Sequence, residues 1–148
     1  MRLSRLALIA AALVAAAGSA HALEYRSVGS SPAILYDAPS AKGRRVFVAP
    51  RGMPVEVVLT YGEWTKVRDA AGDLAWVETR ALAARRTVVV NAAAARVHQA
   101  PDEASPVVFS ASQGVLMDML EPVNAGWVRV RHADGQGGFV RAGEVWGE

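Results

Sequence analysis

The chain contains an internal repeat, and this feature constrains its fold more than any other. The segment ILYDAP at residues 34–39 recurs as RVHQAP at residues 96–101, an offset of 62 residues. After one inserted residue the offset becomes 63, and it relates Trp64 to Trp127. The other matched pairs are Gly52 with Gly114, Val67 with Val130, Arg68 with Arg131, Gly72 with Gly135, Trp76 with Phe139, and Val77 with Val140. We therefore expect two similar structural units in tandem.

Each copy has the pattern of several short strands separated by turns. The expected strands are 54–59, 64–68 and 74–78 in the first copy, and 115–120, 127–131 and 138–141 in the second. Gly72 and Gly135 lie in hairpin loops, where glycine can adopt a positive φ. One helical turn is expected after each last strand, at 79–82 and 142–145. Short strands at this spacing, in a unit of about 60 residues, predict a small β-barrel.

The first 22 residues have the pattern of a secretory signal peptide. Arg2 and Arg5 precede an apolar run of 12 residues at 6–17, and Ala20-His21-Ala22 forms a small-x-small cleavage site. A membrane-spanning helix needs about 20 apolar residues, so we expect no stable membrane anchor. Cleavage after Ala22 leaves 126 residues, which we expect in the periplasm.

Composition excludes several classes of protein and of site. The chain has no cysteine, which excludes disulfides, lipid attachment at cysteine, thiol catalysis and cysteine-ligated zinc. Without Arg2 and Arg5, 14 basic residues balance 14 acidic ones, which argues against a nucleic-acid partner. The charge is uneven, because residues 23–91 carry a net +3 and residues 92–148 a net −3.

The repeated motif resembles the bacterial SH3-like domain in two tandem copies. Its parts are a G-x-x-(V/M) strand, a W-x-x-V-R strand, a glycine-containing hairpin and an (A/G)-(W/F)-V return, over residues 31–83 and 93–146. The whole layout resembles small exported proteobacterial SH3-domain proteins. This resemblance implies an all-β chain with two partly open, five-stranded barrels. We place a first domain at 23–84, a junction at 85–91 and a second domain at 92–148.

The resemblance also implies a role in the cell envelope. Related domains bind cell-wall peptides or position a wall hydrolase. The leading hypothesis is therefore a periplasmic binding module for wall peptides or another envelope component, such as an envelope protein. The alternative is an accessory protein that docks on a separate wall hydrolase and modulates it. The oligomeric state stays open.

The segment ILYDAP also resembles the ALYDY signature of eukaryotic SH3 domains, which bind proline-rich peptides. Such a groove is lined by aromatic rings. Tyr36 is present, but Ala38 stands where the second tyrosine belongs, and the second copy has Val-His-Gln at 97–99. We therefore interpret the segment as a strand that runs into a turn at Pro39, with Leu35 buried.

The candidate binding residues lie on strands 64–68 and 127–131, where a tryptophan and two basic residues share one face. A tryptophan beside cations can stack on a ligand while the cations hold a carboxylate. In the interpretation that we favour, the tryptophans instead cap the barrels and the arginine stems cover them. The predicted site residues are Tyr36, Trp64, Lys66 and Arg68 in the first copy, and Trp127, Arg129 and Arg131 in the second. We expect the positively charged first copy to bind more strongly.

Three other aromatic residues have predicted structural roles. Trp76 and Phe139 follow the hairpins and are expected in the cores, with the wall of a groove as the alternative. Trp146 is expected to pack between the domains. The run Thr87-Val88-Val89-Val90 is apolar enough for a strand shared by both halves, which we expect to unfold together. A group of arginines is interpreted as solvated surface or as a source of attraction to the negatively charged second copy, and the alternative is a site for anionic wall polymer or lipid headgroups. These residues are Arg44, Arg45, Arg51, Arg85 and Arg86.

No pattern of catalytic or metal-binding residues occurs. His98 and His132 lack carboxylates at ligand spacing, so we expect no metal and no cofactor. The two copies share no acid–base pair in a common site. An enzyme is therefore the hypothesis ranked last.

Overall fold

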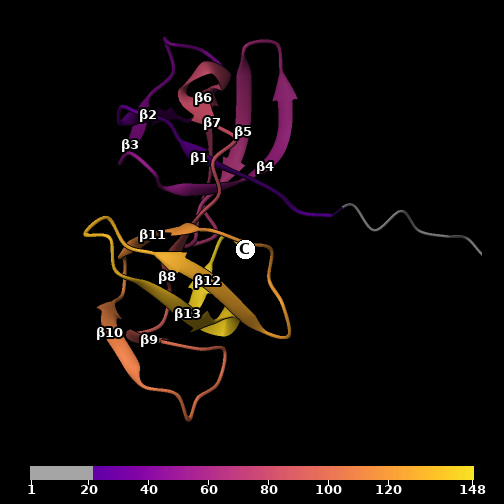
Figure 1. The fold of residues 1–148 in the computed structure, drawn as a ribbon. Coiled ribbons are helices and arrows are strands. Elements are labelled where there is room, and N and C mark those ends of the chain that lie inside the picture. The colour runs from indigo at the N-terminus through magenta and orange to yellow at the C-terminus, as the bar shows by residue number, and fades with distance from the viewer. Residues whose placement is uncertain (1–21) are drawn as a thin grey trace, which may run out of the picture.

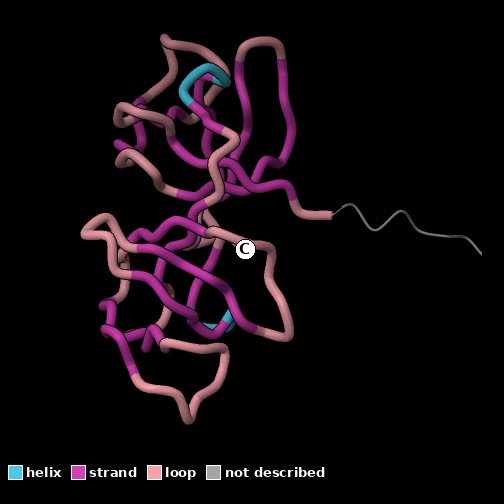
Figure 2. Tube along the Cα trace, viewed as in Figure 1, coloured by secondary structure: helices cyan, strands magenta, loops and turns pink. Residues whose placement is uncertain are grey.

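The computed structural model describes residues 22–148 and contains two β-units of similar construction. In Figure 1 the first unit lies above the second, and the C-terminus ends close to the level between them. Two short 3-10 turns are the helical segments among the described residues (Figure 2). The all-β class with two tandem units is confirmed. The predicted signal peptide falls on residues 1–22, of which 1–21 lie outside the described part of the chain.

The first sheet is antiparallel and has seven strands in the order β3-β2-β6-β5-β4-β1-β7. In chain order they are β1 (Glu24–Val28), β2 (Ala33–Tyr36), β3 (Arg45–Ala49), β4 (Pro54–Tyr61), β5 (Trp64–Arg68), β6 (Leu74–Glu78) and β7 (Leu82–Ala83), with the turn η1 (Thr79–Ala81) before β7. Strands β3 and β7 end the order, so this sheet is an incompletely closed barrel.

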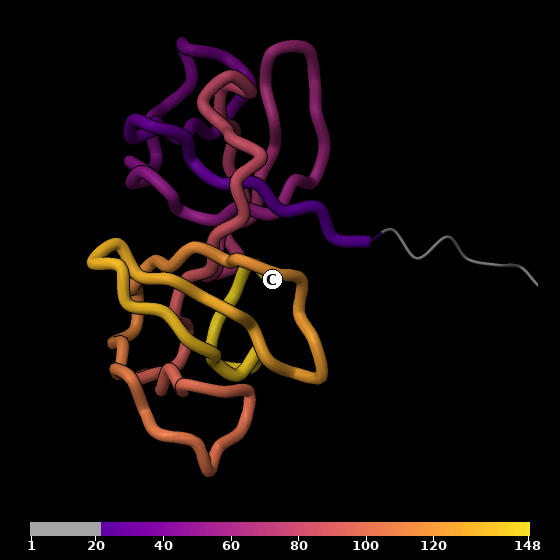
Figure 3. Tube along the Cα trace, in the orientation of Figure 1, coloured from indigo at the N-terminus to yellow at the C-terminus, as the bar shows by residue number. Residues whose placement is uncertain are grey.

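The second sheet has the order β10-β9-β13-β12-β11-β8-β14. Its strands are β8 (Thr87–Val90), β9 (Ala94–His98), β10 (Val107–Ser112), β11 (Leu116–Met119), β12 (Trp127–Arg131), β13 (Gly137–Arg141) and β14 (Val145–Trp146), with the turn η2 (Ala142–Glu144) before β14. Each strand takes the position of the strand numbered seven lower in the first sheet, as the colours of Figure 3 allow the reader to follow. The duplication and both helical turns are therefore confirmed.

Each sheet has seven strands rather than the five that the resemblance implied. The difference lies at the two ends of each unit. Strands β1 and β8 precede most of the matched motif and pair with β4 and β11. The two-residue strands β7 and β14 then follow the 3-10 turns and pair with β1 and β8. The first strand of each unit is thus held on both sides.

Residues 85–91 differ from the expected junction. Thr87–Val90 forms β8, which pairs with β11 and β14 of the second sheet and is not shared with the first. Val88 and Val90 are 0% and 1% exposed and belong to the second core. A run of β-branched residues favours a strand, and this core buries it. Three residues, 84–86, connect β7 to β8.

Each unit has its own core of mostly small and β-branched side chains. Side chains alternate across each strand, so Thr65 and Val67 in β5 point inward and are almost fully buried. Leu35 is buried and β2 ends before Pro39, as predicted. The outward positions of the same strands remain available for a site.

Polar contacts join the two units across the connection. The Thr87 hydroxyl donates a buried hydrogen bond of 2.7 Å to the carbonyl of Gly52. The Ser27 hydroxyl donates one of 2.7 Å to the carbonyl of Arg85. Both bonds link the loop before β4 or strand β1 to the start of the second unit, so the units meet in a defined arrangement.

Aromatic packing completes this seam. The ring of Trp146 meets the ring of Tyr25 edge to face, with centroids 5.2 Å apart. The guanidinium of Arg86 lies 5.4 Å from the Tyr25 centroid. Burial, with the charge of Glu148 as the next cause, raises the pKa of Tyr25. The predicted position of Trp146 between the units is confirmed.

No helix among residues 22–148 has the length and apolar character needed to cross a membrane.

Candidate functional site

The candidate site lies on the outer face of the first sheet, where β2, β6 and β5 are neighbours. Strand pairing sets Tyr36 opposite Trp76, and Trp76 opposite Lys66. Ala75 and Val77 point into the core, at 8% and 1% exposed, so Trp76 between them points outward. The prediction that Trp76 belongs to the core is therefore wrong. Side chains alternate between the two faces of a strand, and the neighbours of Trp76 on both sides point into the core.

Three rings and one ammonium group form what we call the aromatic face, which consists of Tyr36, Trp64, Trp76 and Lys66. Tyr36 and Trp64 meet edge to face, with centroids 5.4 Å apart and planes at 87°. Lys66 Nζ lies 5.9 Å from the Trp76 centroid. Tyr36 is buried, whereas the other three are half-buried. Lys66 forms no ion pair among residues 22–148, so its charge is available to a ligand.

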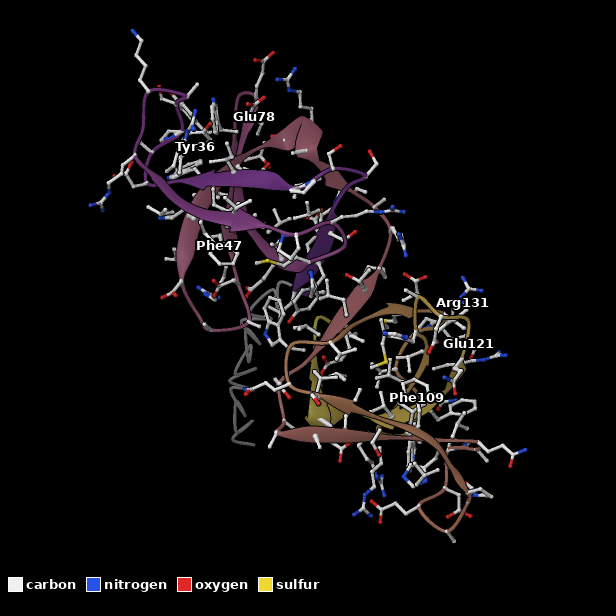
Figure 4. The ribbon with its side chains drawn as sticks, turned by 90° about the vertical axis from the view of Figure 1, so that its left-hand side faces the viewer. Tyr36, Phe47, Glu78, Phe109, Glu121 and Arg131 are labelled. Carbon is white, nitrogen blue, oxygen red and sulfur yellow. The ribbon has the colours of Figure 1, made fainter. Side chains whose placement is uncertain are left out.

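A groove of about 480 Å³ continues from this face. It lies between the loop 29–32, Tyr36, Glu78 and Arg80. The Arg80 Nε donates a hydrogen bond of 2.6 Å to the Glu78 carboxylate. Figure 4 shows Tyr36 and Glu78 close together at the end of the first unit that lies away from the second. Because Tyr36 belongs to both, the groove and the aromatic face form one continuous surface.

Arg68 has a different partner from the one predicted. Its Nη1 donates to both carboxylate oxygens of Glu56, at 3.1 and 2.9 Å. Glu56 is only 9% exposed and lies on β4. A buried carboxylate needs such a partner, so the charge of Arg68 is already neutralised. Lys66 is therefore the cation of this strand that remains free for a ligand.

In the second unit the equivalent tryptophan is covered. Trp127 is 7% exposed, and the Arg141 guanidinium lies 4.3 Å from its ring centroid. His98, which occupies the place of Tyr36, meets Trp127 edge to face at 5.6 Å. The His98 Nδ1 lies 3.1 Å from the carbonyl oxygen of Ser105, which holds the imidazole in place. The second unit thus has no exposed counterpart of Trp64.

The two predicted cations of the second unit both lie near carboxylates. Arg129 donates a hydrogen bond of 2.7 Å to Glu121. Arg131 Nη2 lies 3.7 Å from a carboxylate oxygen of Asp118. Trp127 and Arg129 line one small cavity, whereas Arg131 lines another cavity with Arg85 and Asp118. The three predicted residues of the second unit therefore do not form one surface.

Phe139 is likewise not a core residue. It is half-buried, because Val140 beside it points inward and is fully buried. Phe139 instead lines a small cavity of about 220 Å³ with Trp127 and Pro101. The core prediction fails here for the same reason as for Trp76.

Sequence reasoning favoured the core for Trp76, with a groove wall as the alternative, and it did not identify Glu78 as a member of the site. The alternating run Ala-Trp-Val at 75–77 carried a signal for Trp76, because two small or branched residues around a large ring indicate which face is inward. Nothing in the sequence indicated Glu78. Its place beside Trp64 depends on the register between β5 and β6.

Among the described residues, His98 and His132 do not belong to a cluster of acidic residues that could hold a metal ion. Within residues 22–148, no group of three or more histidine, aspartate or glutamate residues has an arrangement suited to a metal ion. His132 Nδ1 lies 3.1 Å from the Asp134 carboxylate. The backbone N–H of Gln136, with its side chain, lowers the pKa of Asp134.

Comparisons with known proteins agree with this architecture. The family model of the Bacterial SH3 domain matches the chain twice, at residues 29–83 and 91–147. Among curated proteins, no similar sequence was found.

Three solved structures are similar over most of this chain. NlpC2 and NlpC1 from Trichomonas vaginalis are 11% and 12% identical, with TM-scores of 0.39 and 0.40. An NlpC/P60 family protein from Bacillus cereus is 17% identical, with a TM-score of 0.38. The matches cover 86%, 90% and 83% of this chain, and 49%, 49% and 56% of those chains. The chain therefore spans about half the length of these proteins.

Proposed function

Because the chain belongs to the bacterial SH3 domain family, we propose that it is a non-catalytic binding module of the cell envelope. Domains of this family are typically binding modules. Its ligand is a peptide segment of the cell wall, bound mainly by the first unit. The observation that carries this proposal is the aromatic face, where half-buried rings lie beside the ammonium group of Lys66.

The chemistry of this surface suits a peptide that carries charges of both signs. Wall peptides offer carboxylates, amines and small side chains. Half-buried rings provide a flat apolar surface for the small side chains. Lys66 can hold a carboxylate. Glu78 in the adjoining groove can hold an amine in exchange for its bond to Arg80, because that ion pair is exposed to solvent. Neither side chain has to transfer a proton or form a covalent bond in this role, so neither is a catalytic residue.

The second unit supplies scaffold rather than a second equivalent site. Arg141 covers Trp127, and Arg129 is paired with Glu121. The net charge of residues 92–148 is also −3, which disfavours acidic ligands. The proposal therefore keeps the expectation that the first unit binds more strongly, and it adds a structural reason.

A pull-down on purified sacculi tests this function. Mature protein, residues 23–148, should sediment with sacculi. Sedimentation should decrease at higher salt, because salt screens the attraction between exposed charges, over a length of about 10 Å at 0.1 M. Lys66→Ala should reduce sedimentation about tenfold, the effect of losing one charge-assisted hydrogen bond. Lys42→Ala removes an exposed lysine of the same unit and is the matched control. Equal binding of all three proteins would reject the aromatic face as the site.

We also propose that the protein acts after export. The support is the signal-peptide pattern at residues 1–22. Mass spectrometry of the periplasmic fraction should find an N-terminus at Leu23. An intact Met1 in a membrane fraction would contradict export by cleavage.

Docking on a separate wall hydrolase is the second candidate function, and strand β3 favours it. This strand lies at the edge of the first sheet, and Val46, Phe47 and Val48 are 45%, 48% and 64% exposed. An exposed apolar edge can add a strand from a partner. The adjacent Arg44 and Arg45 favour a hydrolase with an acidic edge strand.

The two candidates predict opposite responses in one assay. If docking is the function, the protein should change the rate at which a purified wall hydrolase digests sacculi. Val48→Glu should then abolish this effect, while Lys66→Ala should leave it intact. If Lys66→Ala abolished the effect and Val48→Glu left it intact, the result would support the binding module.

A further inference from the structure

A second cavity lies between the two units, and it is separate from the aromatic face. Its volume is about 370 Å³. Figure 4 shows Arg131, which lines it, at the end of the second unit nearer to the first, whereas Tyr36 lies at the far end of the first unit. The residues that matter here are Arg51, Arg85, Thr87, Leu116, Asp118 and Arg131. We call this cavity the inter-unit cleft.

The cleft has an excess of positive charge. Three arginines line it, one from each unit and one from the connection, and Asp118 is the only carboxylate in the lining. Arg85 and Arg131 both form ion pairs with Asp118, the second at 3.7 Å. Arg51 is exposed and forms no ion pair among residues 22–148. The cleft therefore holds one carboxylate and has cationic capacity for another.

Hydrogen bonds across the seam fix the backbone that carries these arginines. Gly52, next to Arg51, accepts the bond from Thr87 and donates one of 2.8 Å to the carbonyl of Val28. Its φ of +80° favours glycine at this turn. Arg85 accepts the bond from Ser27 through its carbonyl. Arg51 and Arg85 therefore extend from backbone that is held in place before any ligand arrives.

The remaining wall of the cleft is apolar. Leu116 and Met117 on β11 line it together with Ala133. An apolar wall beside arginines suits a group with a charged end and a small hydrocarbon side. Arginine binds carboxylates through two parallel hydrogen bonds, and the pairing of Asp118 shows carboxylate chemistry already present in the cleft.

We propose that the inter-unit cleft binds the C-terminal residue of a peptide. Arg51 and Arg131 hold its carboxylate, and its small side chain lies against Leu116. This inference rests on the proposed function for the class of ligand, a peptide, but it uses a different site. Both units contribute to the cleft, which gives the tandem arrangement a purpose that a single unit could not serve.

The test uses two small probes that differ only at the carboxylate. Alanyl-alanine as the free acid should shift the backbone amide resonances of Gly52 and Thr87 in NMR spectra of mature protein. Alanyl-alanine amide should bind about tenfold more weakly, because it lacks the charge-assisted bonds. Arg51→Ala should weaken binding of the acid by a similar factor. Arg45→Ala, which removes an exposed arginine of the same unit outside the cleft, should not.

Three results would overturn the assignment. The acid and the amide could bind equally, Arg45→Ala could weaken binding as much as Arg51→Ala, or inorganic phosphate could shift the same amides while the acid does not. The last result would identify a phosphate site instead.

Sacculus sedimentation separates this inference from the proposed function. If Lys66→Ala abolishes sedimentation and the acid does not bind the cleft, only the cleft assignment fails. If the acid binds and sacculi do not sediment the protein, only the wall-binding function fails.

Discussion

The two units share a fold, but the equivalent tryptophans Trp64 and Trp127 differ in how far they are exposed. In each unit this tryptophan lies opposite the last residue of the return strand, which is Glu78 for Trp64 and Arg141 for Trp127. Arg141 lies over Trp127 and leaves the residue 7% exposed. Glu78 instead accepts a hydrogen bond from Arg80, and Trp64 remains half-buried. One residue on the neighbouring strand therefore decides whether the ring is covered or available.

A second difference reinforces the first. Tyr36 lines the groove of the first unit, whereas His98 in the same place is held by the carbonyl of Ser105. The duplicated framework is the same in both units, but the outward side chains around it are not. The first unit thus presents an open face at positions where the second unit does not.

The largest effect should come from removing the two tryptophans in turn. Trp127→Ala should lower the free energy of unfolding by about 3–4 kcal/mol, because the ring is almost fully buried. Trp64→Ala should cost about half as much, because the ring is half-buried, yet it should abolish sacculus sedimentation. Chemical denaturation and sedimentation measure the two effects. Equal losses of stability would mean that the exposure of the two rings does not differ in solution.

Separating the two units tests whether each of them is an independent domain. Fragments 23–84 and 85–148 keep β8 with the sheet to which it belongs. Each fragment should lose about 2 kcal/mol of stability, because two seam hydrogen bonds and the Tyr25–Trp146 contact are absent. Thermal melts measure the loss. Midpoints equal to that of the full-length protein in both fragments would show that the seam adds no stability.

Exchanging the residues beside the tryptophans should convert one unit toward the other. Glu78→Arg should cover Trp64 and reduce sacculus binding about tenfold, a loss equivalent to about 1.4 kcal/mol. Arg141→Ala should uncover Trp127. Protein labelled with 5-fluorotryptophan allows the exposure of each of its four tryptophans to be followed by fluorine NMR. No change of the Trp64 resonance in Glu78→Arg would contradict the role given to this position.

Much of the fold could be predicted because it depends on local patterns. The repeat, the strands on either side of each hairpin and the two helical turns follow from spacing, alternation and glycine positions. The apolar run at 87–90 predicts a strand at β8, but one that lies in the junction and is shared by both halves. Its pairing with β11 and β14 is a contact between segments distant in the sequence, and alternation within the run cannot reveal it.

The site was predictable only within single strands. Alternation correctly placed Trp64, Lys66 and Arg68 on one face, but it could not show that Glu56 on β4 engages Arg68. That pairing depends on a register shift between β4 and β5. The inter-unit cleft depends on how two barrels meet, which no local pattern encodes. From the sequence alone, Arg51 and Arg85 are therefore expected only as solvated surface or as a source of attraction to the second copy.

The seam should weaken at alkaline pH through Tyr25. Its pKa is raised above the ordinary value of about 10 in the folded protein, chiefly by burial. The folded state thus holds the phenol proton more tightly than the unfolded state does. This contribution to stability is complete below pH 10 and is lost as the pH rises through the folded-state pKa. Tyr25→Phe should remove this part of the pH dependence in melts recorded between pH 8 and pH 11, values chosen to bracket about 10.

The smallest effect should distinguish the two equivalent arginines. Arg68→Ala leaves the carboxylate of Glu56, only 9% exposed, without its partner, and should cost about 1 kcal/mol of stability. Arg131→Ala should cost less, because Asp118 retains its ion pair with Arg85. Neither change should reduce sacculus sedimentation as much as Lys66→Ala, since the charge of Arg68 is already neutralised in the fold. If Arg68→Ala alone abolished sedimentation while the unfolding midpoint stayed unchanged, Arg68 would have to leave Glu56 to bind the ligand, and the open face of the first unit would extend across the whole of β5.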